Sequence, residues 1–145
     1  MFKHLLVPID GSPTAQLAVD KAIGIARAFS SAVSVLYVID PYPFTGVGSD
    51  FSLGQTQYLS AARSEANEAL AQARKSFEAA GIRVGASLVE AHAVWRGIIE
   101  AAEAGGADLI VMGSHGRSGF EKLVLGSVAQ RVLSHAHQPV LVVRR

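Results

Sequence analysis

The sequence predicts an α/β fold, in which helices cover both faces of an open parallel sheet. Short apolar runs alternate along the whole chain with segments of helical periodicity, and this alternation is typical of successive β–α–β units. Two of the runs, residues 33–39 and 109–112, are almost continuously apolar, as expected for strands buried on both faces. At 145 residues the chain is long enough to bury one core. We therefore expect a single domain over residues 1–145, with five strands.

Composition and charge exclude several classes of function. The 13 Lys and Arg residues nearly balance the 12 Asp and Glu residues, so we expect no basic surface for nucleic acid. No apolar run approaches the roughly 20 residues of a membrane helix, and the apolar start is too short for a signal peptide. The absence of Cys excludes disulfides and thiolate catalysis. We expect a cytoplasmic protein that binds neither nucleic acid nor a membrane.

The first strand is expected over residues 5–9, and a helix should follow it. Asp10 and Gly11 end the strand, Ser12 is a good helix N-cap, and Pro13 suits the first helical position. Apolar residues then recur at helical spacing, which predicts a buried face made of Ala18, Ala22, Ile25, Ala26 and Phe29.

A second strand over residues 33–39 leads into a long predicted loop over residues 40–55. Prolines and glycines interrupt this loop, which carries the aromatic residues Tyr42, Phe44 and Phe51. These rings either pack onto the domain or form a lid or partner contact. Residues 57–80 should form the longest helix, whose apolar stripe is Leu59, Ala62, Ala66, Ala69, Leu70, Ala73 and Phe77.

The second half of the chain repeats the alternation. Residues 82–88 alternate apolar and polar, which predicts a strand exposed on one side and therefore at an edge. A helix should follow from Val94 to the glycines at 105 and 106, and a strand over residues 108–112. The last helix should begin near Ser127, with Val128, Val132, Leu133 and Ala136 on one face. The last strand is expected at residues 139–143.

A glycine-rich segment connects the fourth strand to the fourth helix. Gly113, Gly116 and Gly126 lack a Cβ, so they let the backbone take positive φ angles and approach a ligand closely. The helix starting near Ser127 offers unpaired N–H groups and the positive end of its dipole. These features predict a phosphate cradle, although a plain surface connection is the alternative.

The spacing of this segment resembles a known signature. Gly, two residues, Gly, nine residues, Gly and Ser is similar to the nucleotide-binding motif in the ATP-binding branch of the universal stress protein family. Residues 5–12, 36–40 and 138–143 also resemble that family. The resemblance implies a Rossmann-like fold (adenine nucleotide α-hydrolase-like) with strand order 3-2-1-4-5. It also implies ATP and Mg²⁺ as cofactors.

That strand order predicts where a ligand crevice and a dimer interface lie. Winding reverses between the first and fourth strands, and ligands bind outside the carboxyl ends of the strands at such a point. Asp10 and Gly113 end these two strands. Residues 140–143 are apolar on both faces yet lie at an edge in this order, which invites pairing with a second copy. We expect a homodimer through residues 139–143, as the resemblance also implies.

The family motif assigns site residues. It implies nucleotide contacts by Pro8, Ile9, Asp10, Val38, Met112, Gly113, Ser114, His115, Gly116, Arg117, Gly126, Ser127 and Val128. Val38 would meet adenine through its backbone, or is simply a core residue. Asp10 suits a ribose hydroxyl, or Mg²⁺ held indirectly through the phosphates, but it could instead cap the first helix.

Three further residues near the phosphates have two interpretations each. His115 is a candidate proton donor or charge partner, although a hydrogen-bonding loop residue is the more ordinary role. Arg117 and Lys122 could offset phosphate charge, or could do nothing specific.

Residues 91–93 read Ala-His-Ala where the family commonly carries Gly-x-Pro, so this turn could reshape the adenine or ribose side of the crevice.

Competing motifs are missing. The chain has no GxxxxGK[ST] loop, no GxGxxG after the first strand and no GxSxG. His135 and His137 are two positions apart on the expected helix, which makes a poor metal pair. A nucleotide-dependent, dimeric binding module is therefore the leading hypothesis. A slow ATPase or phosphotransfer enzyme using the same crevice is the alternative, and a nucleotide-free dimeric interaction protein is the third.

Overall fold

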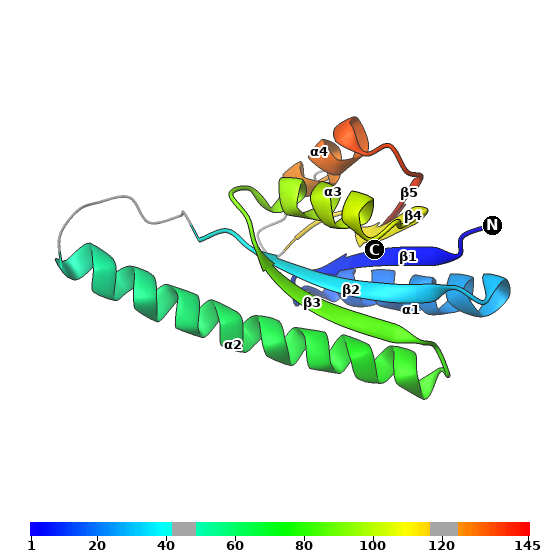
Figure 1. The fold of residues 1–145 in the computed structure, drawn as a ribbon, viewed down its shortest axis with the longest axis horizontal. Helices are drawn as coiled ribbons and strands as arrows, with labels where there is room; N and C mark the ends of the chain where they lie inside the picture. Colours follow the sequence, from blue (N-terminus) through cyan, green and yellow to red (C-terminus); the bar gives the residue numbers. More distant parts are fainter. Residues whose placement is uncertain (42–48, 117–124) are drawn as a thin grey trace.

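The chain forms one open, five-stranded parallel sheet with two helices on each face (Figure 1). The computed structural model describes residues 1–41, 49–116 and 125–145, and for residues 49–53 the backbone alone. The elements in chain order are β1 His4–Ile9, α1 Pro13–Phe29, β2 Ala32–Ile39, α2 Ser49–Ala79, β3 Val84–Glu90, α3 Val94–Ala104, β4 Leu109–Gly113, α4 Ser127–His135 and β5 Val140–Val143. The strand order β3-β2-β1-β4-β5 confirms the predicted topology.

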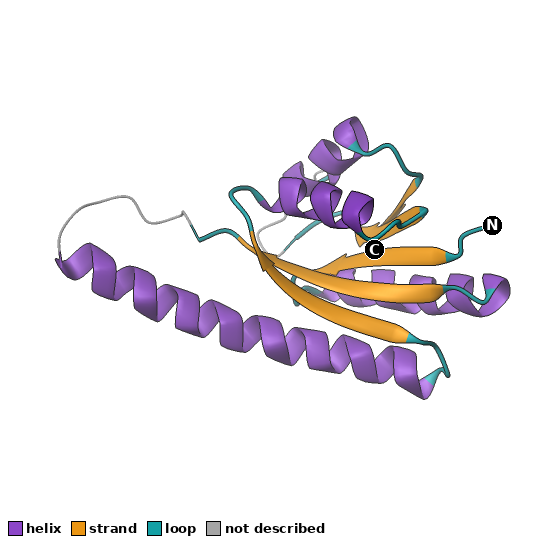
Figure 2. Cartoon of the chain, in the orientation of Figure 1, coloured by secondary structure: helices purple, strands orange, loops and turns teal. Residues whose placement is uncertain are grey.

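Two apolar clusters hold the layers together. One joins the sheet to α1 and α2, and the other joins its opposite face to α3 and α4. Figure 2 shows the strands as a middle layer between these helix pairs. Both clusters draw on neighbouring positions of β1 and β2, for example Leu5 and Leu6, since alternate side chains of a strand point to opposite faces. This explains the continuous apolar runs of the central strands.

The start of α1 follows the predicted local chemistry. Ser12 is the N-cap, its Oγ accepts a hydrogen bond from the Ala15 N–H at 3.1 Å, and Pro13 occupies the first turn. The helix ends at Ser30, which adopts a left-handed conformation with φ 54°. These contacts place the carboxyl end of β1 directly against the beginning of α1.

The pairing of β1 with β4 is short. The two strands pair at Leu5–Leu109 and Leu6–Ile110, whereas β1 continues to Ile9 and β4 to Gly113. By contrast, β1 and β2 pair from His4 through Ile9. The carboxyl-terminal residues of β1 and β4 therefore extend beyond their common ladder, and the crevice lies there.

Several sequence expectations need correction. The helix α2 begins at Ser49, so the predicted loop ends earlier than residue 55. Tyr42 and Phe44 lie outside the described residues.

Two residues that were expected on buried helix faces are exposed. Phe29 and Leu133 are 44% and 43% exposed and belong to no buried face. Phe29 instead packs edge-on against Phe2, with ring centroids 5.4 Å apart. Helical spacing places such residues near the boundary of the apolar stripe, and spacing alone does not fix where that boundary lies.

Two histidines connect elements of the fold, and one of them, His137, lies off the helix on which it was expected. His4 joins three elements, because Nδ1 lies 2.9 Å from the Gly105 carbonyl oxygen and Nε2 lies 2.7 Å from Ser34 Oγ. His137 lies beyond the end of α4, and its Nδ1 is 3.3 Å from Glu103. No helix in the described residues combines the length and the apolar character needed to cross a membrane.

Candidate functional site

A cavity of about 310 Å³ opens at the carboxyl ends of β1 and β4. Its volume falls in the range of roughly 300–1,000 Å³ typical of small-molecule sites. It is lined by Pro8, Ile9, Asp10, Ser12, Ala15, Val38, Val94, Ile98, Met112, Gly113, Ser114, His115, Gly116, Gly126, Ser127, Val128 and Ala129. The structure therefore brings together every site residue named from the sequence except Arg117, which lies outside the described residues with Lys122.

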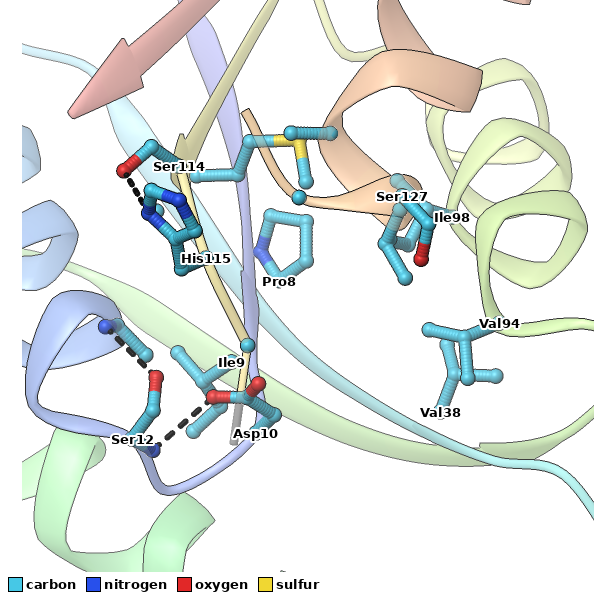
Figure 3. A pocket seen from close by; sticks show the side chains of 17 residues that line it. Pro8, Ile9, Asp10, Ser12, Val38, Val94, Ile98, Ser114, His115 and Ser127 are labelled. Carbon is cyan, nitrogen blue, oxygen red and sulfur yellow. Dashed lines mark hydrogen bonds between the residues drawn. The ribbon is translucent and has the colours of Figure 1, made fainter. Parts of the chain in front are cut away.

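The cavity has an apolar side and a polar side. Figure 3 shows Val38, Val94 and Ile98 on one side and Ser114 and His115 on the opposite side, with strand β1 between them. The apolar side suits a flat ring, and the polar side suits a charged or hydrogen-bonding group. Sequence reasoning missed Val94 and Ile98, although they stand four positions apart at the start of α3 and therefore share a helix face.

The apolar side depends on a close approach of α3 to β2. A Cβ on Gly97 would lie 2.8 Å from Cγ1 of Val38, so a side chain there would require the helix or the valine to shift. Ala93, just before α3, has φ 87° and makes no side-chain cap. Proline cannot adopt a positive φ, so this turn differs in conformation from a Gly-x-Pro turn.

Asp10 lies at the mouth of the cavity. Its Oδ1 accepts a hydrogen bond from the Ser12 N–H at 3.0 Å, so the carboxylate does take part in the turn that starts α1 (Figure 3). Its Oδ2 would lie 2.8 Å from a Cβ on Gly116. The backbone at Gly116 therefore passes directly over this carboxylate.

Gly113, Gly116 and Gly126 do not use the positive φ angles that glycine allows. Among the described glycines, positive φ angles occur at Gly11, Gly81 and Gly106. Gly126, with φ −74° and ψ 166°, has a backbone open to any residue.

Protein atoms fill the space that side chains would need at these three glycines. At Gly113 a Cβ would lie 2.8 Å from Thr14 Cγ2, and at Gly126 it would lie 3.0 Å from the Ser114 carbonyl oxygen. A side chain at Gly113 or Gly126 would therefore meet backbone atoms, whereas one at Gly116 would require the Asp10 carboxylate to move.

The start of α4 faces the cavity without a side-chain cap. The Gly126 N–H donates to the Ser114 carbonyl oxygen at 2.6 Å, which joins the two ends of the glycine-rich segment. No side chain accepts a hydrogen bond at this N-cap. The N–H groups of Ser127, Val128 and Ala129 have no carbonyl partner inside the helix, because its first such hydrogen bond runs from the Gln130 N–H to the Gly126 carbonyl oxygen. They lie where the helix dipole favours an anion.

Ser114 and His115 form the polar wall of the cavity. Ser114 is 1% exposed, and its Oγ lies 3.0 Å from Nδ1 of His115. No group of three or more His, Cys, Asp or Glu side chains that could hold a metal occurs within the described residues. Asp10 is therefore a single carboxylate, suited to a hydrated cation held mainly by a ligand.

The comparisons with known proteins agree on one family. The sequence model of the universal stress protein family matches residues 1–144. Universal stress protein MJ0531 of Methanocaldococcus jannaschii is 39% identical over 145 residues, which is all of this chain and 84% of that protein.

Solved structures are similar over nearly the whole chain. The structure of protein MJ0577 from the same organism has a TM-score of 0.89 at 30% identity, over all of this chain and 97% of that one. The structure of a universal stress protein in complex with cAMP has a TM-score of 0.73 at 25% identity, over 99% of this chain and 97% of that one. Fold, family model and relatives give one answer: the chain belongs to the universal stress protein family.

Proposed function

We propose that this protein is an ATP-binding universal stress protein, a cytoplasmic regulatory module in the stress response whose state depends on nucleotide occupancy. The observation that carries the proposal is the cavity between β1 and β4, which combines an apolar side with an uncapped helix N-terminus. An adenine ring and a phosphate chain need these two environments in one ligand site. The related structure in complex with cAMP supports the adenine nucleotide class.

Each part of the ligand has matching residues. Val38, Val94 and Ile98 would enclose the adenine, since they form the apolar side. Asp10 would accept a hydrogen bond from a ribose hydroxyl. Backbone N–H groups at the start of α4 would bind the phosphates, because the first residues of this helix line the cavity and a helix N-terminus favours an anion.

Mg²⁺ fits this site as a companion of the nucleotide. It prefers oxygen ligands, retains several waters and is usually held through one or two carboxylates together with substrate phosphates. Asp10 is the carboxylate that lines the cavity. We therefore propose that Mg²⁺ binds with ATP and only weakly in its absence.

The proposed active form is a homodimer. The strand β5 lies at the sheet edge and Leu141 is 38% exposed, so the edge presents both unpaired backbone groups and an apolar side chain. Antiparallel pairing with β5 of a second copy would cover both by a two-fold axis.

The first experiment identifies the nucleotide. Purified protein is denatured, and the released small molecules are identified by mass spectrometry. Protein stripped of nucleotide is then titrated calorimetrically with ATP, with and without Mg²⁺, and its melting temperature is measured in parallel. We expect saturable heat and a rise in melting temperature. No heat and no shift at millimolar ATP would refute the proposed function.

A further inference from the structure

Three exposed side chains gather around the partly buried ring of Trp95, where α3 packs against α4 on one face of the sheet (Figure 1). The Cζ atom of Arg96 lies 5.1 Å from the centroid of this ring, and the Cζ atom of Arg131, from α4, lies 5.7 Å from it. The ring of His135, also from α4, lies 4.4 Å from the Trp95 ring at an interplanar angle of 32°. We call these four side chains the α3–α4 patch.

Contacts within the protein hold the patch in place. Arg131 and His135 are four positions apart and therefore share one face of α4. Nδ1 of His135 lies 2.8 Å from the Arg131 carbonyl oxygen, and it donates there because a carbonyl oxygen can only accept. Both guanidinium groups lie within the roughly 6 Å at which an aromatic ring attracts a cation. The patch is therefore arranged without the help of a bound partner.

The positive charge of the patch is not offset by a carboxylate of the described residues. Neither Arg96 nor Arg131 takes part in an ion pair among them. Of the acidic residues on α3, Glu103 meets His137 instead, and Glu100 is within ion-pair distance of neither arginine. Guanidinium groups stay charged in proteins, so two of them around one ring repel each other. An anion bound at the patch would relieve this repulsion.

The combination of groups fits an acidic segment of a partner protein. Each guanidinium can bind a carboxylate through two parallel N–H groups, and the exposed part of the Trp95 ring can cover an apolar side chain beside it. Trp and Arg are also among the residue types that most often dominate the binding energy of protein interfaces. Nucleic acid fits less well, because proteins that bind its backbone neutralise several phosphates, whereas this patch has two arginines in a chain of net charge +1.

We propose that the α3–α4 patch is a docking site for an acidic segment of a partner protein. Its carboxylates would bind Arg96 and Arg131, and a neighbouring apolar side chain would pack on Trp95. None of the four patch residues lines the cavity, and none belongs to β5. The inference therefore depends on neither the proposed nucleotide binding nor the proposed dimer.

The fluorescence of Trp95 reports directly on the patch, because the chain has 1 Trp. A phage library of random peptides, encoded without Trp, is selected on the full wild-type chain. A synthetic peptide of the selected sequence is then titrated into the protein while the emission of Trp95 is recorded. We expect selected sequences rich in Asp and Glu beside an apolar residue, a saturable change in emission, and weaker binding at higher salt.

The double variant Arg96→Gln with Arg131→Gln should bind the selected peptide roughly tenfold more weakly, since two exposed ion pairs are lost. Arg27→Gln with Arg83→Gln is the matched control. It removes the same charge from two exposed arginines, one on α1 at the opposite face of the sheet and one at the amino end of β3. The control should bind as the wild type does, and melting temperatures of both double variants establish that they are folded.

Three outcomes would overturn the inference. The first is a selection that yields no binding peptide, or peptides without an excess of Asp and Glu. The second is equal peptide affinity in the two double variants. The third is tighter binding of a single-stranded oligonucleotide than of the peptide, which would assign the patch to nucleic acid.

Discussion

Gly126 lies directly against Ser114. Its N–H donates to the Ser114 carbonyl oxygen at 2.6 Å, and a Cβ on Gly126 would lie 3.0 Å from the same oxygen. The chain therefore returns to the end of β4 just before α4 begins. This contact determines the position of the polar side of the cavity.

Gly126→Ala should weaken ATP binding and also lower stability, by roughly 1–3 kcal/mol, as is usual when an added methyl group meets fixed backbone. The backbone angles at Gly126 suit alanine, so the loss would come from the contact with Ser114 and His115. Urea unfolding and calorimetric titration measure the two effects. Gly24→Ala is the control, because a Cβ there meets nothing within 4 Å and should stabilise α1 by about 0.5–1 kcal/mol. Wild-type stability and affinity in Gly126→Ala would contradict this account.

Gly97→Ala should displace α3 from Val38 and narrow the apolar side of the cavity. A Cβ at Gly97 would lie 2.8 Å from Val38 Cγ1, so either the helix or the valine must shift. We expect a loss of about 1–3 kcal/mol in the free energy of unfolding and weaker nucleotide binding. Val38→Ala in the same chain should restore part of both. Gly85→Ala in β3, where a Cβ has open space, serves as the control for a glycine substitution that meets no neighbour.

Asp108→Asn should change how stability depends on pH. Burial works to raise the pKa of Asp108, but hydrogen bonds from the backbone N–H groups of Lys3 and His4 outweigh it and hold the pKa below its ordinary value of 3.8. The ionised carboxylate therefore stabilises the fold above the unfolded pKa, and this contribution is lost as pH falls through the lower folded pKa.

Asp108→Asn should accordingly lower the free energy of unfolding by roughly 1 kcal/mol at pH 7. Between pH 5 and pH 2 the variant should lose less of its stability than the wild type does. Urea unfolding across that range measures both. An acid dependence identical to that of the wild type would show that another group is responsible.

Leu141→Lys should convert the proposed dimer to a monomer. Leu141 is exposed on β5, and a charge at this edge opposes its pairing with a second copy. Analytical ultracentrifugation at micromolar concentration distinguishes the two states. Leu133→Lys, at a similarly exposed leucine on α4, should remain dimeric. A monomeric wild type would refute the dimer itself.

ATP turnover should be far below the ~1–100 s⁻¹ typical of kinases. The cavity offers a single carboxylate, Asp10, and no metal-binding group of three in the described residues. Phosphate release is measured with excess Mg-ATP. Turnover in the kinase range that disappears in Asp10→Ala or His115→Ala would favour the enzyme hypothesis instead.

The elements could be predicted because the apolar patterns are strong. The central strands are buried on both faces and β3 alternates, which predicts a parallel sheet with β3 at an edge, whereas the full strand order came from the family resemblance. The start of α2 could not be predicted, because Ser49 follows a segment with prolines and glycines and no helical stripe marks it. Likewise, motif spacing brought Gly113, Gly116 and Gly126 to one site but did not reveal which atoms they touch. Those contacts involve Thr14 and Asp10, which are distant in sequence.

The uncapped start of α4 has a consequence for how the protein responds to its ligand. A phosphate bound there would supply the hydrogen bonds that no side chain provides, so the first turn of α4 would be completed from outside the chain. The order of this turn would then follow nucleotide concentration. Since α4 leads within a few residues into β5, occupancy of the cavity and the edge proposed for self-association would be thermodynamically linked.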